Sequence, residues 1–116
     1  MKKFLAVYTG SGDAIGKWKS MPEDKRRQRE AEGIKAWNQW VEKNKGSIVD
    51  TGAPLGKTKR ATTAGVSDTR NNMTAFTVVQ AESHEDAAKL FLNHPHFTIF
   101  PGDAVEVMPV LPVPGG

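Results

Sequence analysis

The sequence predicts one α+β domain whose strands and helices follow the order β-α-β-β-β-α-β. Its 116 residues are enough for one hydrophobic core. Hydrophobic residues make up 38% and charged residues 25%, which are ordinary values for a globular protein. Stretches with strand character alternate with two stretches of helical periodicity, and no segment repeats. The ferredoxin-like plait, built from two right-handed β-α-β units, is the simplest fold for this order.

The first quarter of the chain predicts a strand followed by a long helix. Residues 3–8 are aliphatic and aromatic and form a strand, and the turn-forming residues 9–13 predict a loop. A helix begins at Pro22, a favourable first helical residue, and Gly46 ends it as a C-cap. Ala31, Ile34, Trp37 and Val41 have the spacing of a buried stripe, which Trp40 widens.

The middle of the chain is polar and rich in turn formers. Residues 47–50 predict a short strand and residues 51–56 a loop. The threonine-rich residues 59–66 predict a polar strand at a sheet edge, and residues 67–72 a second turn.

The last third predicts a strand, a helix and a strand. Residues 75–81 contain Phe76, Val78 and Val79 and carry the strongest strand signal. A helix starts at Ser83 with a sequence similar to a capping box, and it stops before Pro95. Residues 104–110 predict the final strand. The domain therefore spans residues 1–110, and residues 111–116 form an extended, proline-containing tail.

The two strongest strands are apolar on both faces. Apolar side chains point to both sides of each strand: they are those of residues 4–8 in the first strand, and of Phe76, Val78 and Val79 in the second. Two helices cover only one face of a small sheet, so another surface must cover the second face. We expect that surface to be the same face of a second copy, in a homodimer with two-fold symmetry.

Composition excludes several classes of protein. The chain has no cysteine, which removes disulfides, thiolate nucleophiles and most zinc sites. The apolar run near the N-terminus is shorter than the roughly 7 residues that a signal peptide needs. No stretch approaches the roughly 18 apolar residues of a membrane span. We therefore expect a cytoplasmic protein without a membrane partner.

The net charge of +3 favours anionic partners only slightly. Basic residues cluster at positions 25–29, and Lys57, Lys59 and Arg60 stand elsewhere. Acidic residues interleave with the first cluster and no stacking aromatic residue accompanies it, which is typical of a solvated helix face. The sequence therefore predicts no nucleic-acid partner. The segment from Gly52 to Thr58 resembles a phosphate loop, but its glycines are one residue too close together.

A small set of residues could form a ligand pocket. The candidate ligand-binding residues are Tyr8, Trp37, Trp40, Asp50, Lys57 and His94. Asp50, next to a loop of glycine and proline, is the best candidate for a buried functional carboxylate, and an Asx-turn is the alternative. Asp50 and His94 are the catalytic candidates. Tryptophans at helical spacing belong more often to the core than to a pocket.

The two histidines at positions 94 and 96 have a structural interpretation as well. They could bind a metal only with a third ligand, Asp103 or Glu106. The simpler interpretation is that His94 caps the end of a helix and His96 lies in a surface loop. We therefore predict no metal and no cofactor.

Several segments, in order, resemble the YCII-related (YCII/DGPF) domain proteins. They are residues 3–8, the tryptophan-bearing helix, residues 46–56, residues 81–87 continued through His94 and Pro95, and residues 105–109. The resemblance covers nearly the whole chain. It implies a ferredoxin-like, dimeric α-β barrel with a small pocket. It also implies that some relatives act on ring compounds with a histidine and an aspartate.

Two departures from that family bear on function. The histidine that enzyme-like members carry on the first helix is absent from residues 34–37, and residues 67–70 lack the Asp-Gly-Pro-Phe signature. Three functions therefore stay open. The first is binding of a small organic ligand, the second is acid-base, lyase-like catalysis by Asp50 and a histidine, and the third is an assembly domain without a ligand.

Overall fold

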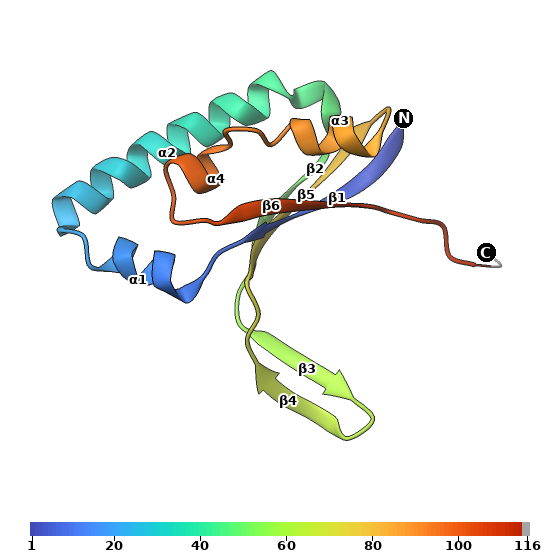
Figure 1. Cartoon of the computed structure of the whole chain (residues 1–116), viewed down its shortest axis with the longest axis horizontal. Coiled ribbons are helices and arrows are strands. Elements are labelled where there is room, and N and C mark those ends of the chain that lie inside the picture. Colours follow the sequence, from blue (N-terminus) through green and yellow to red (C-terminus); the bar gives the residue numbers. More distant parts are fainter. Residues whose placement is uncertain (115–116) are drawn as a thin grey trace.

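A computed structural model describes residues 1–114 of the chain. Its elements, in chain order, are β1 (Lys2–Thr9), α1 (Gly12–Lys19), α2 (Glu23–Lys43), the 3-10 turn η1 (Lys45–Ser47), β2 (Ile48–Pro54), β3 (Thr58–Thr62), β4 (Gly65–Thr69), β5 (Met73–Ala81), α3 (His84–Lys89), α4 (Pro95–Thr98) and β6 (Ala104–Pro109). Four strands form an antiparallel sheet in the order β2-β5-β1-β6, and β3 and β4 form a separate two-stranded sheet (Figure 1). The predicted α+β class is confirmed.

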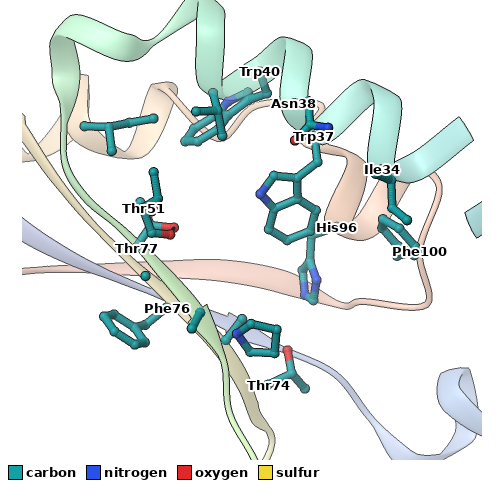
Figure 2. A pocket seen from close by; sticks show the side chains of 16 residues that line it. Ile34, Trp37, Asn38, Trp40, Thr51, Thr74, Phe76, Thr77, His96 and Phe100 are labelled. Carbon is teal, nitrogen blue, oxygen red and sulfur yellow. Dashed lines mark hydrogen bonds between the residues drawn. The ribbon is translucent and has the colours of Figure 1, made fainter. Parts of the chain in front are cut away.

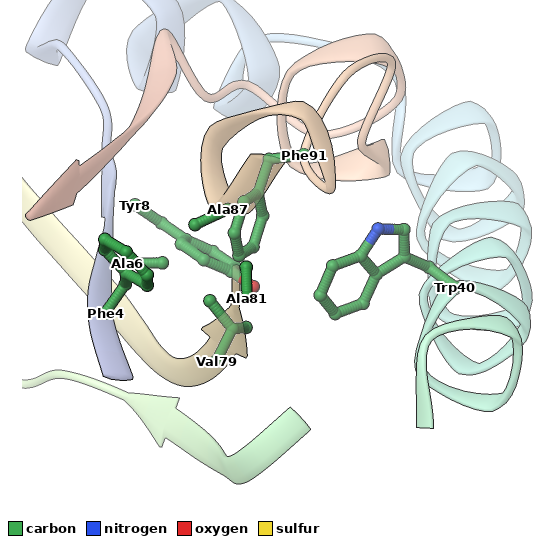
Figure 3. Close-up of a cluster of buried hydrophobic side chains, with 8 residues drawn as sticks. All are labelled: Phe4, Ala6, Tyr8, Trp40, Val79, Ala81, Ala87 and Phe91. Atoms are coloured by element: carbon green, nitrogen blue, oxygen red, sulfur yellow. The ribbon is translucent and has the colours of Figure 1, made fainter. Parts of the chain in front are cut away.

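The core lies between one face of the four-stranded sheet and the helices. Phe4 of β1 pairs with Val79 of β5, and Ala6 pairs with Thr77, so these side chains share one face. Trp40 of α2 and Phe91, after α3, pack onto that face (Figure 3). The buried hydrophobic cluster consists of Phe4, Ala6, Tyr8, Trp40, Val79, Ala81, Ala87 and Phe91. We call this the covered face.

The opposite face of the sheet has an apolar centre, with Glu106 opposite Val7 toward its β6 edge, and no helix within residues 1–114 covers it (Figure 1). The cross-strand pairs on this side are Leu5 with Val78, Val7 with Phe76, and Leu5 with Met108. Met108 is 43% exposed, whereas Phe4 on the covered face is 1% exposed. We call this the open face. The expectation that two helices cover only one side of the sheet is therefore confirmed.

The polar middle of the chain differs from its prediction. Residues 59–66 do not form one edge strand. They are divided between β3 and β4, which pair from Thr58 opposite Thr69 to Thr62 opposite Gly65. Gly65, at a φ of 117°, allows the chain to reverse there. Half of the predicted turn at residues 67–72, namely residues 67–69, belongs to β4. Thr63 and Ala64, at the reversal, are not residues that favour turns strongly, so the hairpin was not predicted from the sequence.

Three helical predictions also need correction. The helix α1 begins inside the predicted loop of residues 9–13 and continues to Lys19, where no helix was predicted, because the Ser11 side chain accepts a hydrogen bond from Ala14 N at 3.3 Å and caps it. α2 ends at Lys43 rather than near Gly46, with Asn44 as its C-cap. The predicted helix after Ser83 stops at Lys89, and a second short helix, α4, follows. The capping role of Ser83 is confirmed by its bond from Asp86 N at 3.1 Å.

Two extensions leave the body of the molecule. The β3-β4 hairpin projects from the sheet, and the chain after β6 runs away from it (Figure 1). The radius of gyration is 16.1 Å, compared with about 13 Å for a compact domain of this length. Val110 N still donates to Lys3 O at 3.0 Å. The end of the predicted tail, residues 115–116, lies outside the described residues.

Within residues 1–114, no helix combines the length and the apolar character needed to cross a membrane.

Candidate functional site

A cavity of about 630 Å³ lies between α2 and the strands β2 and β5 (Figure 2). Its wall is mostly apolar, with a few hydroxyl, amide and imidazole groups, which is the usual make-up of a small-molecule pocket. The lining residues are Ile34, Trp37, Asn38, Trp40, Val41, Ile48, Thr51, Gly52, Ala53, Pro54, Thr74, Ala75, Phe76, Thr77, His96 and Phe100.

The aromatic wall of the cavity is held by contacts outside it. Trp40 Nε1 donates to Leu90 O at 2.8 Å, so the indole polar group is satisfied without a ligand. The ring of Trp37 is perpendicular to that of His94, with centroids 4.5 Å apart, and meets Phe100 edge-on at 6.0 Å. Both tryptophans therefore belong to the core and to the cavity wall, which are the two interpretations that the sequence left open.

His94 lies behind the tryptophans and is fully buried. Its Nδ1 accepts a hydrogen bond from His96 N at 3.0 Å and caps the start of α4. The expectation that His94 caps the end of a helix is therefore wrong, because Pro95 begins a new helix. Since Nδ1 accepts, the neutral ring carries its proton on Nε2, and Nε2 has no hydrogen-bond partner in the described structure. Burial, and secondarily the charge of His96, lower the pKa of His94 to about 4.

His96 is buried, not in a surface loop as expected. Its Nε2 donates to Thr9 O at 2.8 Å, because a carbonyl oxygen can only accept. Nδ1 is the remaining acceptor of a ring that lines the cavity (Figure 2), and no hydrogen bond within residues 1–114 engages it. Burial lowers the pKa of His96, although the Thr9 bond and the charge of Asp103 oppose that effect. A side chain on Gly102 would collide with this imidazole, so the glycine makes room for it.

A directed chain of hydrogen bonds reaches the cavity from the core. Thr77 Oγ1 donates to Thr51 O at 3.1 Å, so it accepts from the Tyr8 hydroxyl at 2.8 Å. Tyr8 is fully buried, and burial raises its pKa to about 12 despite the bond to Thr77. Tyr8 is therefore neutral at physiological pH and orients Thr77, which lines the cavity.

Asp50 is exposed on β2 rather than buried. Its carboxylate accepts a hydrogen bond from Gly52 N at 2.8 Å, which is the Asx-turn that the sequence offered as the alternative. Gly52 has a φ of 70°, and a side chain there would collide with Phe76 O. Within residues 1–114, no hydrogen bond or ion pair joins Asp50 to a histidine.

The structure brings four of the six candidate residues together and leaves two apart. The rings of Tyr8, Trp37 and Trp40 surround His94 with centroid separations of 4.5–5.2 Å. Lys57 is exposed at the root of the β3-β4 hairpin, and neither Lys57 nor Asp50 lines the cavity.

Sequence reasoning missed His96, Thr77 and Phe100 as cavity residues. A signal for His96 was present, because Pro95 is a favourable first helical residue and His94 a polar residue before it. Together they indicate a helix start that turns His96 inward. Thr77 carried no signal, because threonine is an ordinary strand residue.

Comparisons with known proteins identify the fold only. No family model matches the chain, and no curated protein matches it. A solved structure of 5-chloro-2-hydroxyhydroquinone dehydrochlorinase (TftG) from Burkholderia phenoliruptrix AC1100, in complex with 2,5-dihydroxybenzoquinone, superposes with a TM-score of 0.54. The two chains are 18% identical, and the match covers 91% of this chain and 90% of that chain. This likeness supports a small α+β domain with an antiparallel sheet.

Proposed function

We propose that this chain binds a small, planar organic molecule in the cavity between α2 and the sheet. The observation that carries the proposal is the cavity itself, whose volume of about 630 Å³ falls within the range of small-molecule sites. Trp37 and Phe100 offer flat apolar surfaces to a ring. Thr77, Asn38 and His96 offer polar groups that could orient it. The ring compound bound by the structural neighbour TftG agrees with this class of ligand.

Catalysis is the second candidate, and one observation favours it. His96 is neutral near pH 7 because burial lowers its pKa, and its Nδ1 is unused at the cavity wall. A neutral imidazole in that position can take a proton from a bound hydroxyl or acidic C–H. The pair of Asp50 and His94, predicted from the sequence, lacks this geometry, since the Asp50 carboxylate already accepts a hydrogen bond from Gly52 N. Asp103, whose charge acts on His96, is the carboxylate better placed to support the base.

We further propose that the protomer is a ferredoxin-like plait that forms a homodimer. β1 and β2 both run antiparallel to β5 and are joined through α2, and β5 and β6 both run antiparallel to β1 and are joined through α3 and α4. These are two interleaved β-α-β units, as in the plait. The open face supplies an apolar surface that a second copy would bury. The third alternative, an assembly domain without a ligand, uses the same surface.

A pair of neighbouring substitutions on α2 tests the ligand proposal. Asn38 lines the cavity, whereas Gln39 is exposed and does not. In Asn38→Trp the added indole should fill the cavity, and Gln39→Trp is the matched control. The probes are 2,5-dihydroxybenzoquinone and related hydroxylated rings, and the measurement is the melting temperature of each protein with and without the probe. A ligand at about 100 times its Kd stabilises the folded state by about 2.7 kcal/mol.

We expect the parent and Gln39→Trp to be stabilised and Asn38→Trp not to be. Equal stabilisation of both variants would place the ligand elsewhere, and no stabilisation of the parent by any of these rings would contradict the proposal. Chloride release from 5-chloro-2-hydroxyhydroquinone, if present, should fall by about 100-fold or more in His96→Gln, as for loss of a general base.

A further inference from the structure

The β3-β4 hairpin carries the whole net charge of the protein. We define the arm as residues 57–70, which comprise the hairpin and the two flanking basic residues. The arm contains Lys57, Lys59, Arg60 and Arg70 against the single acid Asp68, a net charge of +3. The net charge of the entire chain is also +3, so the remaining residues hold twelve basic and twelve acidic side chains. The body is electrically balanced, and its excess positive charge projects from it (Figure 1).

The two faces of the arm differ in charge. Lys59 stands opposite Asp68, and the two form an ion pair at 2.6 Å on one face, beside Ala61 and Val66. Arg60 stands on the other face, opposite Ser67. The neighbours of Arg60 on that face are the hydroxyl residues Thr58, Thr62 and Thr69. The only acid of the arm is therefore neutralised on the face away from Arg60.

The arm is mostly exposed, and three of its four basic side chains have no partner within residues 1–114. Its residues are exposed except for the half-buried Thr58 and Thr69 at its root. In residues 1–114, no hydrogen bond or ion pair engages the cationic groups of Lys57, Arg60 or Arg70. A two-stranded ribbon without a hydrophobic face gains little stability by itself. Lys57, Lys59 and Arg70 also line a cleft of about 530 Å³ at its root.

The basic cluster of α2 is different, although it has the same residue types. Arg27 is paired with Glu23 at 2.6 Å, and Arg29 donates to Ile99 O at 3.0 Å. Arg26 donates to Lys19 O at 3.3 Å. These cations are already engaged within the chain. The sequence-based expectation of no nucleic-acid partner weighed Lys57, Lys59 and Arg60 together with this cluster, but the sequence did not show that these three residues lie on a projecting arm.

We propose that the arm binds the phosphate backbone of double-stranded nucleic acid without sequence preference. Arginine, lysine and hydroxyl side chains are the usual donors to phosphate oxygens. A two-stranded β-ribbon fits the major groove of DNA, which is about 12 Å wide. The arm has no aromatic residue, so it lacks the stacking surface used for single strands. Its tip, residues 62–65, has no aromatic or long aliphatic side chain to insert into a membrane.

Fluorescence anisotropy with a labelled DNA duplex tests the proposal. Three unpaired cations predict that affinity falls by about 40-fold between roughly 50 and 200 mM salt. The arm variant is Lys57→Gln, Arg60→Gln and Arg70→Gln together. The matched control removes the same charge from exposed positions of α2, as Lys25→Gln, Lys35→Gln and Lys43→Gln. We expect the arm variant to bind at least tenfold more weakly with a flatter salt dependence, and the control to retain at least the larger part of parental binding.

Three results would overturn the proposal. They are no duplex binding by the parent at low salt, equal weakening in both triple variants, and binding of the parent to phosphatidylserine vesicles or polyglutamate but not to the duplex. The arm variant should keep the parental melting temperature, because none of the three side chains packs in the core. If the arm variant melts at a lower temperature than the parent, the single variant Arg60→Gln replaces it. Arg60→Gln must then bind the duplex more weakly than the single control variant Lys35→Gln.

Discussion

The two faces of the four-stranded sheet both have apolar side chains at their centres, but these side chains are buried to different extents. On the covered face Phe4, Tyr8 and Val79 lie beneath the helices and are at most 1% exposed. On the open face Leu5 and Val78, their neighbours along the same strands, keep part of their surface in contact with solvent. The difference shows that an apolar strand pattern specifies that a face needs cover, but not which surface provides it.

The basic side chains of α2 and of the arm differ in the same way. Basic residues at positions 26, 27 and 29 are engaged within the chain. In contrast, no hydrogen bond or ion pair within residues 1–114 engages the cationic groups of Lys57, Arg60 or Arg70, which belong to the projecting arm (Figure 1). In both comparisons, side chains of the same type differ in role. The fold packs or pairs the apolar or basic side chains of one region and leaves those of the other region more exposed.

The largest effect should come from opening the covered face. Phe4→Ala removes a fully buried ring from the central strand. It should lower the free energy of unfolding by about 3–5 kcal/mol, from lost burial and the resulting cavity. Leu5→Ala, one residue away on the open face, should cost roughly 1–2 kcal/mol because Leu5 is only half-buried. Urea unfolding of both variants measures the difference, and equal losses would mean that the two faces are equally packed.

The next largest effect is the pH dependence of the free energy of unfolding, to which the buried His94 contributes. Its pKa is about 4 in the folded protein and about 6.5 in an unfolded chain. As the pH falls, the unfolded state takes up the proton first. The stabilisation is therefore complete above about pH 6.5 and is lost as the pH falls toward 4, by roughly 3 kcal/mol. The lowered pKa of His96 acts in the same direction.

His94→Asn separates the two histidines. The Asn side chain can still accept from His96 N and cap α4, but it does not titrate. Urea unfolding at about pH 7 and about pH 4.5 should show a smaller loss of stability in the variant than in the parent. An unchanged loss would assign the pH dependence to other groups.

The smallest effect tests what covers the open face. Val78→Thr keeps the shape of the side chain and adds a hydroxyl. In a monomer the hydroxyl would meet solvent at little cost. In the proposed dimer each copy would bury it, which should cost about 2 kcal/mol in all and raise the dimer Kd by roughly 30-fold. Sedimentation velocity over a range of concentrations measures this constant.

Val66→Thr is the control, since Val66 is 72% exposed on the arm. It should leave the dimer constant unchanged. A parent protein that stays monomeric at micromolar concentration would contradict the dimer. If Val78→Thr and the parent have the same dimer Kd, the dimer interface does not include the open face.

The core strands and their order along the chain could be predicted from the sequence. The strands at residues 3–8, 75–81 and 104–110 agree with β1, β5 and β6 within two residues at each end. The capping signal at Ser83 worked because N-capping depends on a contact between residues three apart. The hairpin was missed because its turn uses Thr63 and Ala64, which have weak turn preferences. The helix α1 was missed although its cap Ser11 is a favourable N-cap, because Ser11 lies within the run of turn-forming residues 9–13.

The sequence by itself determined the α+β class and the excess of apolar strand surface, because these depend on composition and on the periodicity of neighbouring residues. Only the tertiary structure decided that His94 and His96 are both buried, that Asp50 closes a turn, and that Thr77 and Phe100 reach the same cavity as Trp37. Those outcomes depend on contacts between residues far apart in the chain. Burial and hydrogen-bond partners, rather than residue type, set the protonation and the role of each group.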